Sequence, residues 1–293
     1  MKSLTQYILE KQNVNFGASN PSYNQCVILA GGPASGKGYV KDLKLLLNFK
    51  TVDVDEMKKQ YIKLQERGKI KDDDYSYDFK KAEDVFRLHM KVKNKGWKTK
   101  QRTNFWKSQE VSARKNDLHL PNILWDMVSD DPDDVYEIIR YAKPLGYKIT
   151  LIWVCANMET AKAANKMRDR TVPDSVLHAG HAGAYKTIEE ILRNKYKTIT
   201  DGIDTAWIVF SAGYKRMLTG WFKDNPVIKI KKDQEGDFDY KYEDNVNKFL
   251  TKQMPEDPEW EKKKQAEAER KKHVESARFK ESLDDYIYSI VWE

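Results

Sequence analysis

The stretch Ala30-Gly-Gly-Pro-Ala-Ser-Gly-Lys-Gly38 decides the fold, because it has the spacing of a phosphate-binding loop. It follows the apolar run at residues 26–30 and precedes a helical run at residues 39–47, which is the context such a loop requires. Small residues let successive backbone N–H groups turn toward phosphate oxygens, and a helix starting near Lys37 directs its N-terminal dipole at the same charge. We therefore predict that ATP phosphates bind to Gly31, Gly32, Pro33, Ala34, Ser35, Gly36, Lys37 and Gly38.

The residue after the lysine departs from the usual pattern of this loop. That position is normally Ser or Thr, whose hydroxyl coordinates Mg²⁺, and here it is Gly38. Ser35 lies inside the loop and is poorly placed to replace that hydroxyl. We expect Mg²⁺ to be a cofactor together with ATP, held by the phosphates, water and a carboxylate, with Asp53 as a candidate acting through water. The alternative, a glycine-rich turn without a ligand, leaves Lys37 without a purpose.

Short apolar runs rich in β-branched and aromatic residues predict buried strands. Most of the spacers between them exceed the dozen residues that a parallel crossover needs. The pattern predicts an α/β fold of the P-loop NTPase type, with a doubly wound, mostly parallel sheet of five to six strands flanked by helices. The predicted strands are residues 26–30, 51–54, 123–125, 149–154 and 206–210, with 227–230 as an edge strand.

Two segments interrupt or follow this alternation. We predict a kinase domain at residues 1–230 that contains a helical, basic and aromatic insertion at 58–121, and a charged, largely helical extension at 231–293. Within the insertion, residues 91–115 carry nine Lys/Arg and one acid, interleaved with three large aromatic residues, so they could bind single-stranded nucleic acid. We favour the alternative that these residues form a helical hairpin, which covers the pocket for the molecule that accepts the phosphoryl group. The aromatic residues are Trp97, Phe105 and Trp106.

The bulk properties favour a protein of the cytoplasm. The formal net charge of +7 suits anionic partners, although many proteins without such partners carry a similar charge. The two cysteines, Cys26 and Cys155, each lie in a predicted strand and fit neither a disulfide framework nor a zinc site. The N-terminal residues lack an apolar signal core, and no apolar run is long enough to span a membrane.

Three aspartates follow predicted strands, at the sheet edge where ligands bind in open α/β folds. The second strand ends in Thr51-Val-Asp-Val-Asp-Glu-Met57, and the third ends in Asn122-Ile-Leu-Trp-Asp-Met127, which brings Asp126 to the same edge. A kinase needs one carboxylate to take the proton of the acceptor hydroxyl and another to orient the metal. Alternation in an extended chain puts Asp53 and Asp55 on one side, so they could share a site, and we expect Asp53 to lie at the substrate. The alternative for Asp55 is an N-cap of the next helix.

Arg168 and Arg170 end the helical segment that follows the fourth strand, and Pro173 comes shortly after them. Guanidinium groups neutralise the charge that phosphoryl transfer spreads over equatorial oxygens. Residues two apart point about 200° from each other on a helix, so we predict that the helix ends between the two arginines. The alternative is favourable charge at a helix C-terminus.

His178 and His181 lie in Leu177-His-Ala-Gly-His-Ala-Gly-Ala184. We interpret this segment as a flexible loop over the substrate, because no carboxylate or cysteine at ligand spacing completes a zinc site. In this interpretation His181 contacts a phosphate or the acceptor.

These motifs together resemble the zeta toxin family of P-loop kinases over about residues 25–210. The resemblance rests on the phosphate loop, on VDVDEM after the second strand, on the acid in ILWDMV, on LGYKITLIWVCANMETA and on Arg168 followed by Arg170-Thr-Val-Pro. The chain departs from the family at Gly38, at Asp126 where glutamate is expected, and at Met127-Val128 where Gly-Thr is expected.

The resemblance implies transfer of the ATP γ-phosphate to a hydroxyl of a UDP-activated amino sugar or another small acceptor. It implies that Asp55 is the general base, that Asp126 lies at the substrate, and that Arg168 and Arg170 hold the ATP phosphates. A toxin would also have an antitoxin-like protein partner. The sequence leaves two alternatives open: a polynucleotide or nucleoside kinase, favoured by the basic insertion, and a non-catalytic nucleotide-binding module, favoured by Gly38.

Overall fold

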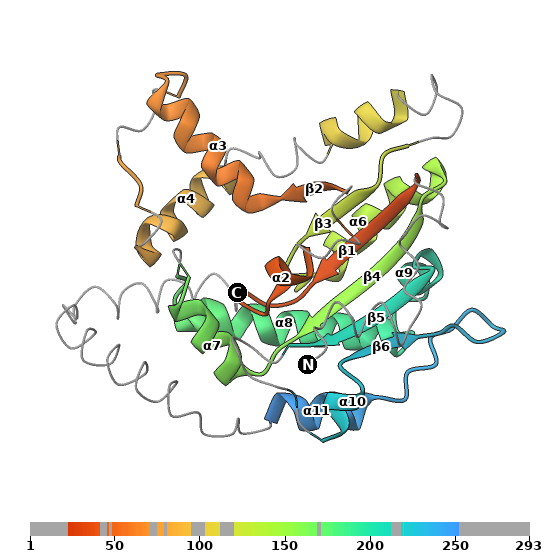
Figure 1. Cartoon of the computed structure of the whole chain (residues 1–293). Helices are drawn as coiled ribbons and strands as arrows, with labels where there is room; N and C mark the ends of the chain where they lie inside the picture. Colours follow the sequence, from red (N-terminus) through yellow and green to blue (C-terminus); the bar gives the residue numbers. More distant parts are fainter. Residues whose placement is uncertain are drawn as a thin grey trace.

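The computed structural model describes residues 23–41, 46, 49–70, 75–78, 81–94, 103–111, 120–168, 171–211, 218 and 220–251, without the side chains of 54–57, 60, 82, 93, 94 and 223. These residues form a six-stranded sheet in the order β2-β3-β1-β4-β5-β6 (Figure 1). All neighbouring strands are parallel except β6, which pairs antiparallel with β5 at the edge. The predicted α/β fold and edge strand are therefore confirmed. The strands are β1 (Gln25–Ala30), β2 (Lys50–Asp53), β3 (Ile123–Asp126), β4 (Lys148–Cys155), β5 (Thr205–Phe210) and β6 (Val227–Ile230).

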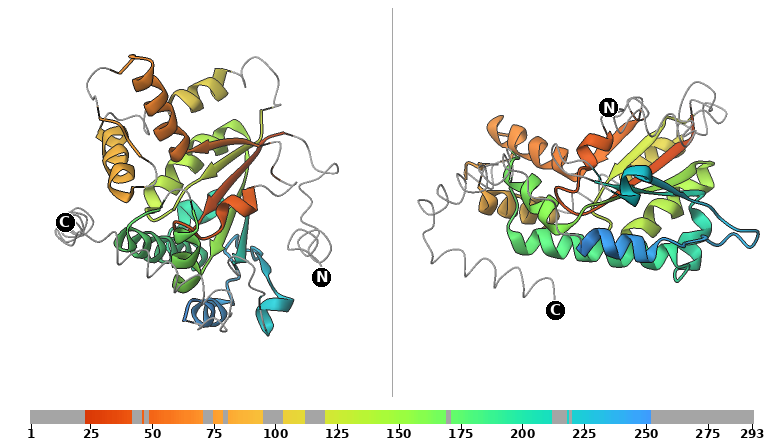
Figure 2. Two further views of the ribbon diagram at one scale, coloured as in Figure 1. Left: turned by 60° about the vertical axis from the view of Figure 1, so that its left-hand side comes forward. Right: turned by 60° about the horizontal axis from the view of Figure 1, so that its bottom comes forward.

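Helices cover both faces of the sheet. Successive residues of a central strand point to opposite faces, and most of them are apolar, so both faces must be shielded from water. On one face, Cys26 and Ile28 of β1 pack in a cluster that takes in α6, α8, α9 and α11. On the other face, Val27 and Leu29 pack with Val40 of α2. Figure 2 shows α8 and α11 together on the first face. The helices are α2 (Lys37–Lys41), α3 (Val54–Glu66), α4 (Ala82–Asn94), α6 (Pro132–Ala142), α7 (Met158–Lys166), α8 (Asp174–Leu192), α9 (Lys197–Gly202), α10 (Trp221–Asp224) and α11 (Glu243–Thr251), with a 3₁₀ turn at Lys143–Leu145.

The described part of the inserted segment contains α3, α4 and a helix at residues 103–111, together with non-helical residues such as 67–70 and 75–78. Phe105 and Trp106 are not available for stacking on nucleotide bases, because both are buried in the main apolar cluster. Trp106 stacks on Trp125 of β3 and on Tyr141 of α6. The two residues are therefore core residues, and Trp97 lies outside the described residues. Nucleic-acid binding by residues 91–115 stays a prediction.

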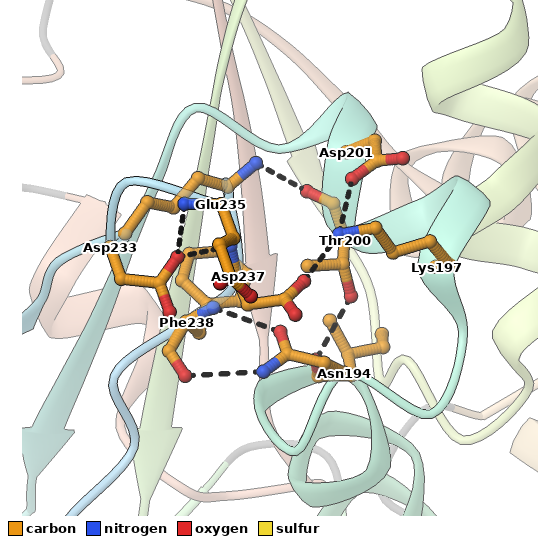
Figure 3. Close-up of polar contacts among 10 residues, drawn as sticks. Asn194, Lys197, Thr200, Asp201, Asp233, Glu235, Asp237 and Phe238 are labelled. Atoms are coloured by element: carbon orange, nitrogen blue, oxygen red, sulfur yellow. Dashed lines mark hydrogen bonds and ion pairs between the residues drawn. The ribbon is translucent and has the colours of Figure 1, made fainter.

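Residues 231–251 pack onto the same core as the sheet, since Phe238, Val246 and Phe249 belong to the main cluster. Asn194 anchors the turn after β6: its side chain accepts from Phe238 N at 2.9 Å and donates to Phe238 O at 3.2 Å (Figure 3). Lys232 donates to the carbonyl of Thr200 at 2.7 Å. A domain boundary at residue 230 stays a prediction, and residues 252–293 lie outside the described residues.

No helix in the described part of the chain combines the length and the apolar character that crossing a bilayer requires. Cys26 and Cys155 are free and buried in β1 and β4, as their apolar surroundings in the sequence predict. Burial raises the pKa of both thiols above the usual value.

Candidate active site

The phosphate-binding loop connects the end of β1 at Ala30 to the start of α2 at Lys37, as the sequence predicts. The loop turns tightly: Ser35 N donates to Gly32 O at 3.2 Å, and Gly36 adopts a φ of +101°, which favours glycine. Ala34 also has a positive φ, of +57°. The Ser35 hydroxyl is buried and has no hydrogen-bond partner among the described residues. A phosphate bound in the loop would supply acceptors for such a donor, so the loop fits the group that its sequence predicts.

Lys37 is the first residue of α2 and turns its ammonium group back onto the loop. Its Nζ donates to the carbonyl oxygens of Gly31 and Gly32, the latter at 3.1 Å. The positive charge therefore lies beside the loop in which a phosphate would bind. A catalytic role of Lys37 stays a prediction.

Helix α8 packs directly against the phosphate loop, and this corrects the prediction of a flexible loop at residues 177–184. The Nε2 atom of His181 lies 2.8 Å from the Pro33 carbonyl, and the imidazole ring packs on Gly32, where a Cβ atom would lie 2.3 Å from it. Gly180 has a similar purpose, since a Cβ there would lie 2.6 Å from Pro33. Gly180 therefore allows close contact between α8 and the phosphate loop.

His181 is a neutral support for the loop in this structure. A carbonyl can only accept a hydrogen bond, so the neutral ring carries its proton on Nε2 and donates it to Pro33. Burial lowers the pKa of His181 to about 4. The hydrogen bond to Pro33 raises the pKa in part, and repulsion by Lys37 and His178 lowers it further. Contact of His181 with a phosphate or an acceptor stays a prediction.

We expect the His181 environment to make the protein less stable as the pH falls from about 6.5 to about 4. The folded-state pKa lies below the ordinary value of 6.5, so the unfolded chain takes up the proton first. The stabilisation is therefore complete above pH 6.5 and is lost toward pH 4, by up to about 3 kcal/mol. Urea unfolding across this interval measures it. His181→Gln should flatten the slope and the exposed His178→Gln should not; equal slopes in all three proteins would contradict the assignment.

The carboxyl ends of β2 and β3 bring two of the three predicted aspartates together. Asp53 and Asp126 are the last residues of these strands and are paired in register across the parallel ladder. Lys41, at the end of α2, lies between them, with its Nζ 2.8 Å from Asp126 Oδ2 and 3.3 Å from Asp53 Oδ2. Sequence reasoning missed Lys41. Its position four residues after Lys37, on the same face of the helix, is the signal that could have found it.

Asp55 lies within the first turn of α3, because this helix begins at Val54. The interpretation of Asp55 as the N-cap of a helix starting at Glu56 is therefore wrong, and Asp53 is the residue directly before the helix. The alternation argument for Asp53 and Asp55 also fails, since strand geometry ends at Asp53. An acidic residue in the first turn of a helix is favoured by the helix dipole.

Arg168 lies in the connection between α7 and α8, with an exposed side chain. Helix α7 ends at Lys166, before both arginines, so the prediction that it ends between them is wrong. The side chain of Asn165 closes this connection, because it donates to Val172 O at 2.8 Å and accepts from Val172 N at 3.1 Å. The connection is thus tied back to the helix end. Arg170 lies outside the described residues.

Comparison with known proteins finds similar folds among solved structures. No family model matches the chain, and no curated protein does. A chain of the AvrRxo1-ORF1:-ORF2 complex aligns with a TM-score of 0.47 at 15% identity, over 80% of this chain and 66% of that chain, so this chain spans just under two thirds of its length. A chain of the PezAT chromosomal toxin-antitoxin system of Streptococcus pneumoniae has a TM-score of 0.46 at 13% identity, with 87% and 88% covered.

Deoxyadenosine kinase from M. mycoides, solved with bound dATP, aligns less well, with a TM-score of 0.32 at 13% identity over 65% of this chain and 93% of that one. At such identities the likeness concerns the fold alone. All three TM-scores lie below 0.5, so the description of the fold rests on the strand order of this chain itself.

Proposed function

We propose that the chain is an ATP-dependent kinase that transfers the γ-phosphate to a hydroxyl of a small acceptor, such as a nucleotide-activated sugar. The observation that carries the proposal is the phosphate loop with the Lys37 ammonium turned onto it. The loop lies at the edge of the sheet where β2 ends in Asp53 and β3 ends in Asp126. A lysine beside an anion-binding loop and carboxylates at the same edge are the parts that phosphoryl transfer needs.

In the proposed reaction the acceptor oxygen attacks the γ-phosphorus, the bond from that phosphorus to the bridging oxygen breaks, and ADP leaves. The loop N–H groups and Lys37 bind the phosphate oxygens. Asp55 takes the proton of the acceptor hydroxyl, a role that follows from the resemblance to zeta toxins, and Asp126 orients the acceptor. Arg168 and Arg170 neutralise charge that develops on the transferred group.

The described residues do not fit a Mg²⁺ ion held by the protein. Gly38 has no hydroxyl, both Asp53 and Asp126 pair with Lys41, and no cluster of three or more His, Cys, Asp or Glu residues in this part of the chain could hold a metal. We propose that Mg²⁺ arrives bound to ATP. The chemistry it supplies there is neutralisation of phosphate charge.

Incubation with γ-labelled ATP tests the proposed function directly. The acceptors are UDP-sugars, nucleosides and oligonucleotides with a free 5′-hydroxyl, and Lys37→Ala prepared in parallel is the control for contaminating kinases. Label on a UDP-sugar would support the proposal, and label on the oligonucleotide would favour a polynucleotide kinase instead. ATP binding without transfer to any acceptor or to water would show a nucleotide-binding module.

The arginines distinguish an enzyme from a binding module. We expect Arg168→Ala and Arg170→Ala each to lower turnover by about tenfold or more while the Kd for ATP changes by less than about threefold, because the guanidinium groups act mainly on transition-state charge. Single-turnover transfer and calorimetric ATP titration measure the two quantities. Lys166→Ala, at the end of the same helix, is the matched control. Equal losses of turnover and affinity would indicate simple nucleotide binding.

The antitoxin-like protein partner and the cytoplasmic location stay predictions from the sequence. The PezAT system is by name a toxin-antitoxin pair, and the AvrRxo1 structures hold two different proteins. If this chain acts as a toxin, a neutralising protein that covers the phosphate loop is the partner we propose.

A further inference from the structure

The paired aspartates at the end of β2 and β3 pose an electrostatic problem. Asp53 and Asp126 are opposite each other in the ladder, so their side chains leave the sheet on the same face. Their side chains are only 16% and 13% exposed, which limits the screening of their mutual repulsion by water. Like charges directly opposite each other in a sheet are destabilising. A proton, a metal ion or a basic side chain must therefore balance them.

Lys41 supplies that balance from a different element. Its ammonium group contacts both carboxylates, at 2.8 and 3.3 Å, and is itself only 26% exposed. At these distances the Lys41 ammonium donates a hydrogen bond to each of the two carboxylates.

In P-loop enzymes a carboxylate and the hydroxyl after the loop lysine usually share Mg²⁺. This chain lacks the hydroxyl at Gly38, although none of the described residues lies within 4 Å of a Cβ atom placed there. Crowding by the described residues therefore does not account for the missing hydroxyl. Gly38, which lacks the metal-binding hydroxyl, lies one helical turn before Lys41 on α2. Lys41 contacts the two carboxylates that could otherwise bind a metal.

We propose that the Lys41 ammonium is a resident cation of this site, which takes the place between Asp53 and Asp126 that a divalent metal would otherwise fill. The proposal deepens the proposed kinase function: the protein holds the two carboxylates in position without a metal, and the divalent ion is held by the nucleotide alone. Lys41 is in this sense a positioning residue for the acceptor side of the site.

Mn²⁺ binding to the nucleotide-free full chain tests the proposal without any need for activity. We expect electron paramagnetic resonance to show no Mn²⁺ bound to the wild type at 100 µM metal. Lys41→Met, which keeps the length of the side chain and removes its charge, should bind Mn²⁺ at least about tenfold more tightly, because the Lys41 ammonium no longer occupies the place between the two carboxylates. Lys41→Arg keeps the charge and should behave as the wild type does. Adding Asp126→Asn to Lys41→Met should remove the new site.

Wild-type binding of Mn²⁺ that disappears in Asp126→Asn would overturn the proposal, and so would a folded Lys41→Met variant that gains no site. If Lys41→Met does not fold, the wild type and Lys41→Arg still decide the question, because tight Mn²⁺ binding by either would refute a resident cation. ATP titration of the same samples separates this result from the proposed function. Failure to bind ATP would remove the kinase proposal and leave the Mn²⁺ result standing.

Discussion

Lys37→Ala is expected to abolish phosphoryl transfer, with a loss of about 10³-fold or more. The Lys37 ammonium contacts the carbonyl oxygens of Gly31 and Gly32 in the phosphate loop, and in the proposed reaction it binds the γ-phosphate during transfer. We also expect ATP affinity to fall, by about tenfold, because a phosphate contact is lost in the ground state as well. Transfer of label from γ-labelled ATP and calorimetric titration with ATP measure the two effects.

The fold should survive this substitution, because the Lys37 side chain is only partly buried and fills no part of either apolar cluster. Circular dichroism and thermal unfolding check that expectation. Lys148→Ala, an exposed lysine at the opposite end of the sheet, is the matched control for loss of one positive charge. Transfer by Lys37→Ala at the wild-type rate would show that the loop does not bind the reacting phosphate.

Asp55→Asn is expected to lower transfer by about 10²-fold or more with little change in ATP affinity, since a general base acts on the acceptor and not on the nucleotide. Asparagine keeps the size of the side chain and removes its ability to take a proton. The rate of transfer under saturating ATP is the measurement. Asp53→Asn is the informative comparison, because Asp53 is paired with Lys41.

If Asp53→Asn is the damaging change and Asp55→Asn is silent, the proton is taken by the residue that ends β2. If both changes are silent, the proton is taken elsewhere or the chain is not a kinase. A damaging Asp55→Asn and a mild Asp53→Asn would support the assignment of the base.

The sheet and the phosphate loop could be predicted because their signals are local. Each central strand is an uninterrupted apolar run, and the loop carries its glycines and lysine at fixed spacing between a strand and a helix. The order of the strands did not follow from the sequence. It depends on long-range pairing such as that of β1 with β3, whose residues are far apart in the chain.

The parts of the site that were missed depend on contacts across the fold. The sequence analysis predicts a flexible loop for the Leu177–Ala184 segment, but the segment is part of α8, whose Gly180 and Gly183 allow close packing against Pro33 and Asp130. Likewise, the spacing of Lys41 from Lys37 gives only its face of the helix, and its importance comes from two carboxylates that β2 and β3 bring together. Propensity and spacing describe neighbours along the chain and not neighbours in space.

The central position of β1 has a consequence for how the protein is made. Gln25 at the start of β1 donates its backbone N–H to the side chain of Asn122, 97 residues later, and both strand neighbours of β1 come after that point. During translation the ribosome therefore releases an apolar strand, with both edges unpaired, long before either partner exists. At about 5–20 residues per second, that interval lasts from about 5 to 20 seconds. Throughout it, nascent β1 is a target for chaperones and for aggregation.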